Sequence, residues 1–132
     1  MRYEKGICAG KKVIVCVTTG ASEDSCSHNG REGDTRLHLW PILFPFRYIG
    51  FDVFQPEVFH GVGGVDFIEG NAGGLSMLET YSNRWTETLK TLSSRPLVQY
   101  NDDEDFDETK RLFSGTPVFS PFVRHNPNAT PQ

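Results

Sequence analysis

The sequence predicts an α/β fold with a doubly wound parallel sheet that is only partly present, about two strands with flanking helices and a C-terminal arm. Residues 12–19 read KVIVCVTT, an uninterrupted apolar and β-branched run typical of a strand buried on both faces. The predicted order along the chain is strand, loop, helix, strand, helix and tail, the alternation of α/β proteins. Because a typical sheet has about five or six strands, this one either borrows edges from a partner or is part of a larger design.

The first predicted helix starts at Asp34, after a polar loop that reaches from Ala21 to Gly33. The carboxylate of Asp34 can cap this helix by accepting a backbone N–H. Pro41 and Pro45 are expected to kink or split it, because each proline removes one backbone hydrogen bond. The expected buried face carries Leu37, Trp40, Leu43 or Phe44, and Tyr48.

The second strand is expected between Phe51 and Phe59, where Pro56 removes a ladder donor and therefore favours an edge strand or a bulged strand. The segment from Gly74 onward holds the clearest amphipathic helix, which should pack on the sheet. Its apolar residues recur at spacings of three and four: Leu75, Leu78, Tyr81, Trp85, Leu89 and Leu92.

The length of 132 residues indicates one domain, with a core over about 11–94 and a tail over 95–132 that we expect to be a surface arm or a partner-wrapping segment. A net charge of -4 disfavours nucleic-acid binding, which needs basic residues to neutralise phosphates. The most apolar stretch is too short to span a bilayer, and three cysteines leave one unpaired in any disulfide scheme. We therefore expect a soluble, cytoplasmic protein without membrane or nucleic-acid partners.

Two segments are candidates for a function. TTGA, at residues 18–21, ends the first strand where open α/β sheets present their ligand crevices, although ordinary turn chemistry is the alternative. Cys26 lies in the polar loop near Arg31, which favours a thiolate, whereas nearby acidic residues oppose it. The four histidines and the acidic run at 102–108 lack the spacing of a metal site, so no metal is expected.

An ordered set of short motifs runs from residue 11 to residue 64: Thr18-Thr19-Gly20 after a strand, Gly33-Asp34, Leu39-Trp40-Pro41-Ile42, Gly50-Phe51 and Pro56. This set resembles the flavodoxin-like NAD(P)H dehydrogenase (quinone) family, the FAD-dependent two-electron quinone reductases. The resemblance fades near residue 100. It implies a flavodoxin-like fold of which the chain is the C-terminal half, because the loop that cradles the flavin phosphates belongs to the family's earlier half.

The resemblance also implies a flavin site at the end of the first strand. FAD would lie with its ring edge along the backbone N–H groups of that turn, and NAD(P)H would supply the hydride. Val62 falls where the family places an apolar contact to the cofactor, and Tyr48 falls near an aromatic of the quinone pocket in the family's dimer. The turn itself is formed by Thr18, Thr19, Gly20 and Ala21.

Two positions depart from the family pattern. The tyrosine and histidine that relay charge from the reduced flavin in the family's best-known members align with Cys26 and Glu32. An ionised Glu32 would oppose the negative charge that develops on the flavin, unless Arg31 or Arg36 neutralised it or burial raised its pKa. The relay is therefore either absent or rebuilt from different residues.

Three functional hypotheses follow from these observations. The first is a flavin-linked NAD(P)H:quinone oxidoreductase that works as a symmetric dimer and accepts a quinone or another small aromatic substrate. The second is a non-catalytic remnant or interaction subunit that completes its sheet with a separate N-terminal half or with itself. The third keeps the fold but has Cys26 and Glu32 act on an aromatic substrate without flavin.

Overall fold

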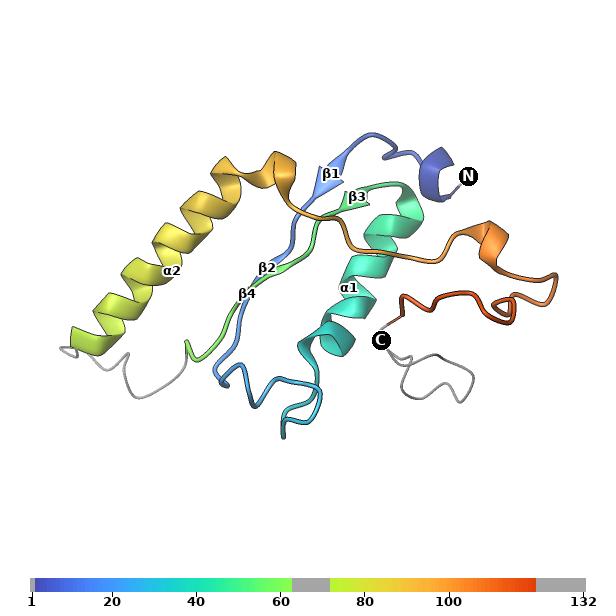
Figure 1. The fold of residues 1–132 in the computed structure, drawn as a ribbon. Helices are drawn as coiled ribbons and strands as arrows, with labels where there is room; N and C mark the ends of the chain where they lie inside the picture. Colours follow the sequence, from blue (N-terminus) through green and yellow to red (C-terminus); the bar gives the residue numbers. More distant parts are fainter. Residues whose placement is uncertain (1, 63–71, 121–132) are drawn as a thin grey trace. The chain divides into compact units, whose positions relative to one another are not determined.

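The computed structural model describes residues 2–62 and 72–120, and the chain divides into two compact units, Met1–Leu97 and Val98–Gln132. The first unit holds every strand and both α-helices of the described chain, with α2 and α1 on either side of the strands (Figure 1). Residues 63–64 of the segment that carries the resemblance, His125 and the end of the expected tail, 121–132, lie outside the described residues.

Four short strands form the sheet region, and each pairing is parallel, as the sequence predicts. The first predicted strand is two segments that pair with two segments of the second: β1 (Lys12–Val13) with β3 (Asp52–Val53), and β2 (Cys16–Thr18) with β4 (Glu57–Phe59). Lys12 lies opposite Asp52, but Cys16 lies opposite Glu57, so one extra residue enters the second strand between the two pairings. The second strand is therefore bulged, which is one of the two forms expected from Pro56.

The first strand is less buried than its sequence predicts. Val13, Ile14, Val15 and Val17 are only half-buried, and Cys16 and Thr18 are exposed. The reason is that each described sheet has two strands. The edges of β1 and β2 that face away from β3 and β4 therefore pair with no strand among residues 2–62 and 72–120. An apolar run typical of a central strand is thus half-covered here, and the expectation of burial on both faces is wrong.

Helix α1 (Thr35–Ile49) begins at Asp34, whose side chain accepts the backbone N–H of Arg36 at 2.8 Å, as predicted. The helix runs through Pro41 and Pro45 without a break, so the expected split is wrong. Both prolines are exposed and stand one helical turn apart, so the carbonyl groups that lose a partner face water rather than the core.

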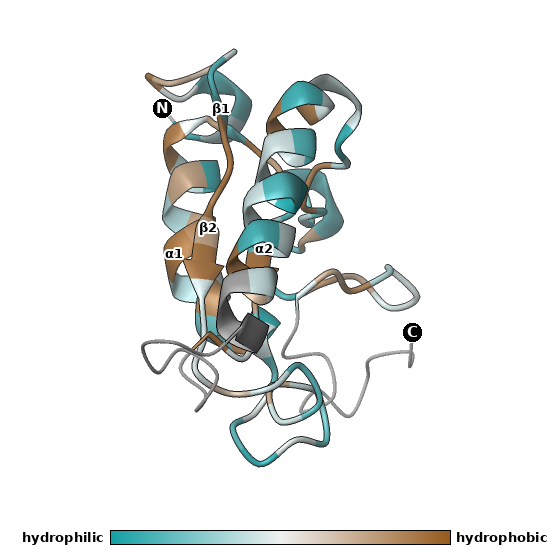
Figure 2. Cartoon of the chain, turned by 90° about the vertical axis from the view of Figure 1, so that its left-hand side faces the viewer, coloured by the Kyte–Doolittle hydropathy of each residue, from teal (hydrophilic) through white to brown (hydrophobic). Residues whose placement is uncertain are grey.

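The inner face of α1 differs from the expected one. Leu39 and Leu43 are its buried residues, whereas Leu37 is half-buried and Tyr48 is 47% exposed. Apolar residues also occur on the outer side of this helix, where Ile42 is exposed, and Figure 2 shows brown positions along much of it. A pattern with apolar residues all round does not single out one face, which explains the error.

Helix α2 (Ala72–Lys90) packs on β4, as the amphipathic pattern predicts, and Leu92 lies just beyond it in the 3₁₀ turn η3 (Leu92–Ser94). The ring of Tyr81 packs against that of Phe59, with centroids 4.8 Å apart and planes tilted by 40°. A carboxylate joins the two elements: Glu57 is buried, accepts the Thr88 hydroxyl at 2.8 Å and pairs with Arg84. The contact surface of α2 is therefore partly polar, and Leu78 and Leu89 of the expected apolar stripe are exposed.

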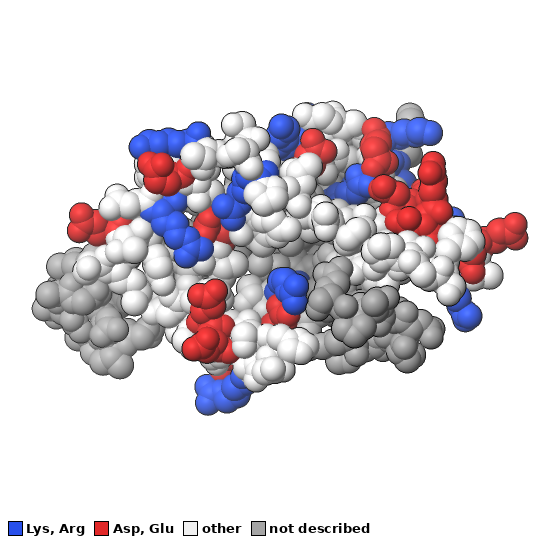
Figure 3. All heavy atoms as spheres, viewed as in Figure 1, with Lys and Arg blue, Asp and Glu red and all other residues white. Residues whose placement is uncertain are grey.

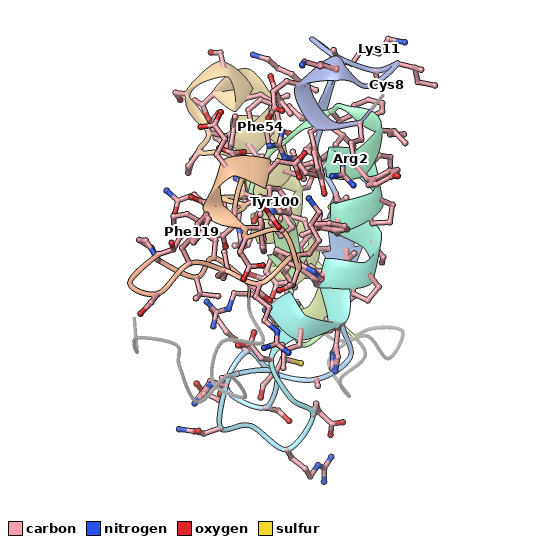
Figure 4. The ribbon with its side chains drawn as sticks, turned by 90° about the vertical axis from the view of Figure 1, so that its right-hand side faces the viewer. Arg2, Cys8, Lys11, Phe54, Tyr100 and Phe119 are labelled. Carbon is pink, nitrogen blue, oxygen red and sulfur yellow. The ribbon has the colours of Figure 1, made fainter. Side chains whose placement is uncertain are left out.

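The segment before β1 is anchored to the end of α1. It begins with the 3₁₀ turn η1 (Tyr3–Lys5), and the Cys8 N–H donates to the Ile49 carbonyl at 3.0 Å. A Cβ at Gly6 would lie 2.2 Å from that same carbonyl oxygen, so the two backbones can approach only with glycine at this position. Figure 4 labels Cys8 and Lys11, which lead from this anchor into the sheet.

The second unit is organised by side-chain hydrogen bonds to its own backbone. Asn101 accepts the Phe119 N–H at 3.1 Å and donates to the Pro117 carbonyl at 2.7 Å. After the 3₁₀ turn η4 (Asp103–Asp105), Asp107 accepts the N–H groups of Arg111 and Thr109, which lowers its pKa. Part of the acidic run is therefore a structural turn.

Acidic and basic side chains are intermingled on the face shown in Figure 3, without a broad basic area among its described residues. In the described chain, no helix is both long enough and apolar enough to cross a membrane.

Candidate functional site at the end of the parallel strands

The candidate site is the turn that follows β2. Thr18 ends the strand, and the Thr19 N–H makes one more hydrogen bond to the neighbouring strand, at 2.9 Å to the Phe59 carbonyl. The chain then leaves the sheet at Gly20, as the sequence predicts. Because β2 and β4 are parallel, the residues that follow both strands meet at one end of the sheet.

Three hydrogen bonds close this turn against the segment after β4. The Val62 N–H donates to the Thr19 carbonyl at 2.8 Å, and the Gly61 N–H donates to the Ala21 carbonyl at 2.9 Å. The Thr19 hydroxyl donates to the same Ala21 carbonyl at 2.8 Å. Gly61 has a φ of 75°, a left-handed conformation that glycine adopts readily, and this lets the chain turn back toward residue 19. The structure thus brings Val62 beside residues 18–21.

The turn keeps two hydrogen-bond donors available. Within residues 2–62 and 72–120, the backbone N–H groups of Gly20 and Ala21 have no acceptor, although the Thr19 and Ala21 carbonyls are both used. Gly20 is exposed and Ala21 is half-buried, so these donors belong to an accessible segment. Adjacent backbone donors on a tight turn bind carbonyl, ring-nitrogen or anionic acceptors of a ligand.

His60 and Tyr81 also belong to this end of the sheet, and neither was predicted as a site residue from the sequence. The Nδ1 atom of His60 lies 3.1 Å from the Thr19 hydroxyl oxygen, and the Tyr81 hydroxyl donates to the His60 carbonyl at 2.5 Å. His60 directly follows β4, just as Thr19 directly follows β2. That matching position was the signal that could have identified His60 from the sequence.

Cys26 and Glu32 lie in a separate, tightly folded loop between the turn and α1. The Glu32 N–H donates to the Ser25 carbonyl at 2.9 Å, and the Cys26 carbonyl accepts the Thr35 N–H at 3.1 Å. Gly30 allows this folding, because a Cβ there would lie 2.1 Å from the Ser25 carbonyl oxygen. In the described chain, neither Cys26 nor Glu32 makes a hydrogen bond or ion pair with residues 18–21 or Val62.

Glu32 forms an ion pair with Arg31. The Arg31 Nη2 atom lies 2.7 Å from the Glu32 carboxylate, whose side chain is 41% exposed. Arg36, the other cation considered for this role, pairs instead with Asp34 at 2.9 Å. The ion pair of Glu32 is therefore made within the loop itself, and water screens it because 89% of the Arg31 side chain is exposed.

Tyr48 lies in the last turn of α1, far along the helix from the loop that follows residues 18–21. Its ring contacts Tyr3 edge to face, with centroids 5.8 Å apart. About thirteen residues of helix separate it from the start of α1, roughly 20 Å at 1.5 Å per residue. The structure therefore does not join Tyr48 to the turn of the same chain. No group of three or more metal-ligating side chains gathers among the residues that the structure describes.

The fold and this turn define the class of protein. The sequence profile described as "Flavodoxin-like fold" matches residues 2–83, and the chain belongs to that family. A crystal structure of a protein assigned as a quinone reductase from Klebsiella pneumoniae matches with a TM-score of 0.69 at 25% sequence identity, over 86% of this chain and 42% of that one. The predicted fold class is thereby confirmed.

Curated relatives narrow the resemblance. The chain is 39% identical over 62 residues to NAD(P)H dehydrogenase [quinone] 1 of Cavia porcellus, a match that covers 46% of this chain and 22% of that protein. It is 33% identical over 57 residues to ribosyldihydronicotinamide dehydrogenase [quinone] of Homo sapiens, covering 42% of this chain and 25% of that protein. The resemblance to quinone dehydrogenases is confirmed, and the chain spans about a quarter of the length of these relatives.

Proposed function

We propose that the chain is part of a flavin-dependent NAD(P)H:quinone oxidoreductase. The observation that carries the proposal is the turn at residues 18–21, which offers the N–H groups of Gly20 and Ala21 at the end of a parallel sheet. Membership of the flavodoxin-like fold family and the similarity to quinone dehydrogenases support it. The proposal places the protein in the cytoplasm, where its three cysteines stay reduced.

The donor set of this turn suits the edge of a flavin ring, which carries carbonyl oxygens and ring nitrogens that accept hydrogen bonds. When bound, FAD would accept a hydride from NAD(P)H and pass it to a quinone or another small aromatic acceptor. Thr18, Thr19, Gly20 and Ala21 would bind and orient this edge. Val62, held to Thr19 by its own N–H, would supply an apolar contact and exclude water from one side.

The remaining candidate residues have less direct roles in the proposal. Cys26 and Glu32 occupy the positions of the family's relay, and the exposed ion pair with Arg31 offsets part of the charge of Glu32. Tyr48 would serve the quinone pocket of a second copy of the chain in a homodimer, because it lies remote from the turn of its own chain.

Flavin retention tests the proposal. We expect the purified chain, incubated with FAD and desalted, to keep the absorbance of bound flavin between about 350 and 500 nm, and to oxidise NAD(P)H only when FAD and a quinone are both present. Val62→Asp should reduce flavin retention, because it places a carboxylate beside the ring while leaving the backbone N–H to close the turn.

Ile7→Asp is the matched control for charge, since Ile7 is 88% exposed and lies before the sheet. It should leave retention unchanged. A colourless wild-type protein with a flat NAD(P)H signal would reject flavin chemistry for the chain by itself.

A second candidate function is an interaction subunit without activity of its own. The open edge of β1 and β2 favours it, because this edge has no partner strand in the described residues. Its expected partner is a separate N-terminal half of a flavodoxin-like sheet, or a second copy of the chain. Co-purification of such a half with a colourless chain would support this alternative, whereas a monomer at every concentration that retains flavin would exclude it.

A further inference from the structure

His60 makes a hydrogen bond that the function as proposed does not use. Its Nδ1 atom lies 3.1 Å from the Thr19 hydroxyl oxygen, and its backbone carbonyl accepts the Tyr81 hydroxyl at 2.5 Å. Three elements therefore converge on this residue: the end of β4, the turn after β2, and α2. The ring is half-buried at the end of the sheet that carries the two available N–H donors.

The proton positions follow from the two contacts of the Thr19 hydroxyl. This hydroxyl has one hydrogen, and it lies 2.8 Å from the Ala21 carbonyl oxygen and 3.1 Å from His60 Nδ1. If the hydrogen pointed to His60, two oxygens would face each other at 2.8 Å with no hydrogen between them. If it points to Ala21, the histidine donates from Nδ1 and both contacts are satisfied.

We propose that His60 is a positioning residue for the flavin-binding turn and that its neutral ring is the Nδ1–H tautomer. Its Nδ1–H donates to the Thr19 hydroxyl, which directs the hydroxyl hydrogen onto the Ala21 carbonyl. That bond closes the turn between the side chain of Thr19 and the carbonyl of Ala21, and so restrains the backbone between them, which carries the N–H groups of Gly20 and Ala21. The inference deepens the proposed function and rests on it for the identity of the ligand, while the tautomer is a property of the chain alone.

The ring tautomer can be measured without any ligand, by ¹⁵N NMR of the imidazole nitrogens at a pH where the ring is neutral. We expect His60 in the wild-type chain to carry its proton on Nδ1. Thr19→Val removes the hydroxyl and should return the ring to the Nε2–H form, which prevails in histidine free in water. Thr19→Ser keeps a hydroxyl and should keep the Nδ1–H form. A wild-type ring protonated on Nε2 would overturn the inference.

Flavin binding supplies the second readout. We expect His60→Phe, which keeps an aromatic ring without a donor, to weaken FAD binding about tenfold, the worth of roughly one hydrogen bond. His60→Asn carries an amide donor close to the position of Nδ1 and should restore binding to within about threefold of wild type. A purely structural role for the ring would give the opposite order, with Phe tolerated better than Asn. His38→Phe is the matched control, because His38 is an exposed histidine on α1.

The outcomes separate this inference from the proposed function. If wild type binds FAD and His60→Phe binds it equally well, the positioning role is wrong and the proposed function stands. If wild type binds no FAD, the proposed function fails for the chain alone, and the ring tautomer in the wild type and the two Thr19 variants still decides whether His60 holds the turn.

Discussion

Replacing Glu57 by glutamine tests whether a buried carboxylate holds α2 on the sheet. Only 4% of its side chain is exposed, and it lies among three donors: Arg84, Thr88 at 2.8 Å, and Arg95 at 3.0 Å. Glutamine has almost the same shape and still accepts the Thr88 hydroxyl. The substitution therefore removes charge from the cluster while leaving its packing nearly unchanged.

The expected loss can be worked out contact by contact. A hydrogen bond to a charged group is worth about 1.5–3 kcal/mol, and breaking a fully buried ion pair costs about 3–5 kcal/mol. Arg84 is 50% exposed, so water replaces much of its interaction and its share falls below about 1 kcal/mol. Arg95 keeps its hydrogen bonds to the carbonyls of Gln55 at 2.6 Å and Pro56 at 2.8 Å, so its guanidinium still has hydrogen-bond acceptors in the variant. We expect a net loss of about 2 kcal/mol.

Urea denaturation followed by tryptophan fluorescence measures this loss in the free energy of unfolding, because Trp85 lies on α2. Glu87→Gln is the matched control, since Glu87 pairs with Lys90 on the same helix with both side chains 66% exposed, and it should change stability by less than about 0.5 kcal/mol. If Glu57→Gln is as stable as this control, the carboxylate does not hold the helix and the reasoning fails.

Burial opposes the ionisation of Glu57, but hydrogen bonds from Thr88 and Arg84 outweigh it and hold its pKa below 4.5. The stabilisation that the ionised carboxylate gives is therefore complete above pH 4.5 and is lost as the pH falls through the lowered pKa. Glu57→Gln should flatten the acid limb of a pH–stability curve. Gly6→Ala should prevent the anchor between the N-terminal segment and α1 from forming, because its Cβ would lie 2.2 Å from a carbonyl oxygen. Gly10→Ala meets no atom within 4 Å and should lower the free energy of unfolding by only about 1 kcal/mol, because of its positive φ. Thermal melting compares the two variants. Asp34→Ala should lower stability by about 1–2 kcal/mol through loss of the helix cap, and Asp34→Asn should recover most of that loss in the same melts; equal stability of the two variants would contradict the capping role.

The sequence was sufficient for features that depend on local chemistry. The Asp34 cap, the bulge at Pro56 and the helix after Gly74 each follow from a residue type at one position or from a repeated spacing, and each is confirmed. The turn at residues 18–21 was located in the same way, by a glycine after a strand. Its binding role stays a prediction.

Features that depend on neighbours in space could not be predicted in this way. The half-covered β1 and β2 edge follows from the number of strands, which an apolar run does not reveal. The continuity of α1 through Pro41 depends on the exposure of that side of the helix. Glu57 also looks like a solvent-facing strand residue in the sequence, and only the arginines brought by later elements explain its burial.

The bulge at Pro56 sets the alignment of the two strand ends. Partner numbers differ by 40 before it, from Lys12 to Asp52, and by 41 after it, from Cys16 to Glu57. If the intact strands paired at an offset of 40 throughout, with no extra residue accommodated, His60 would lie beside Gly20 instead of Thr19. Every side chain of β4 would also move to the opposite face. A single residue in the middle of the sheet, with no chemistry of its own, thus decides which side chains meet at its end.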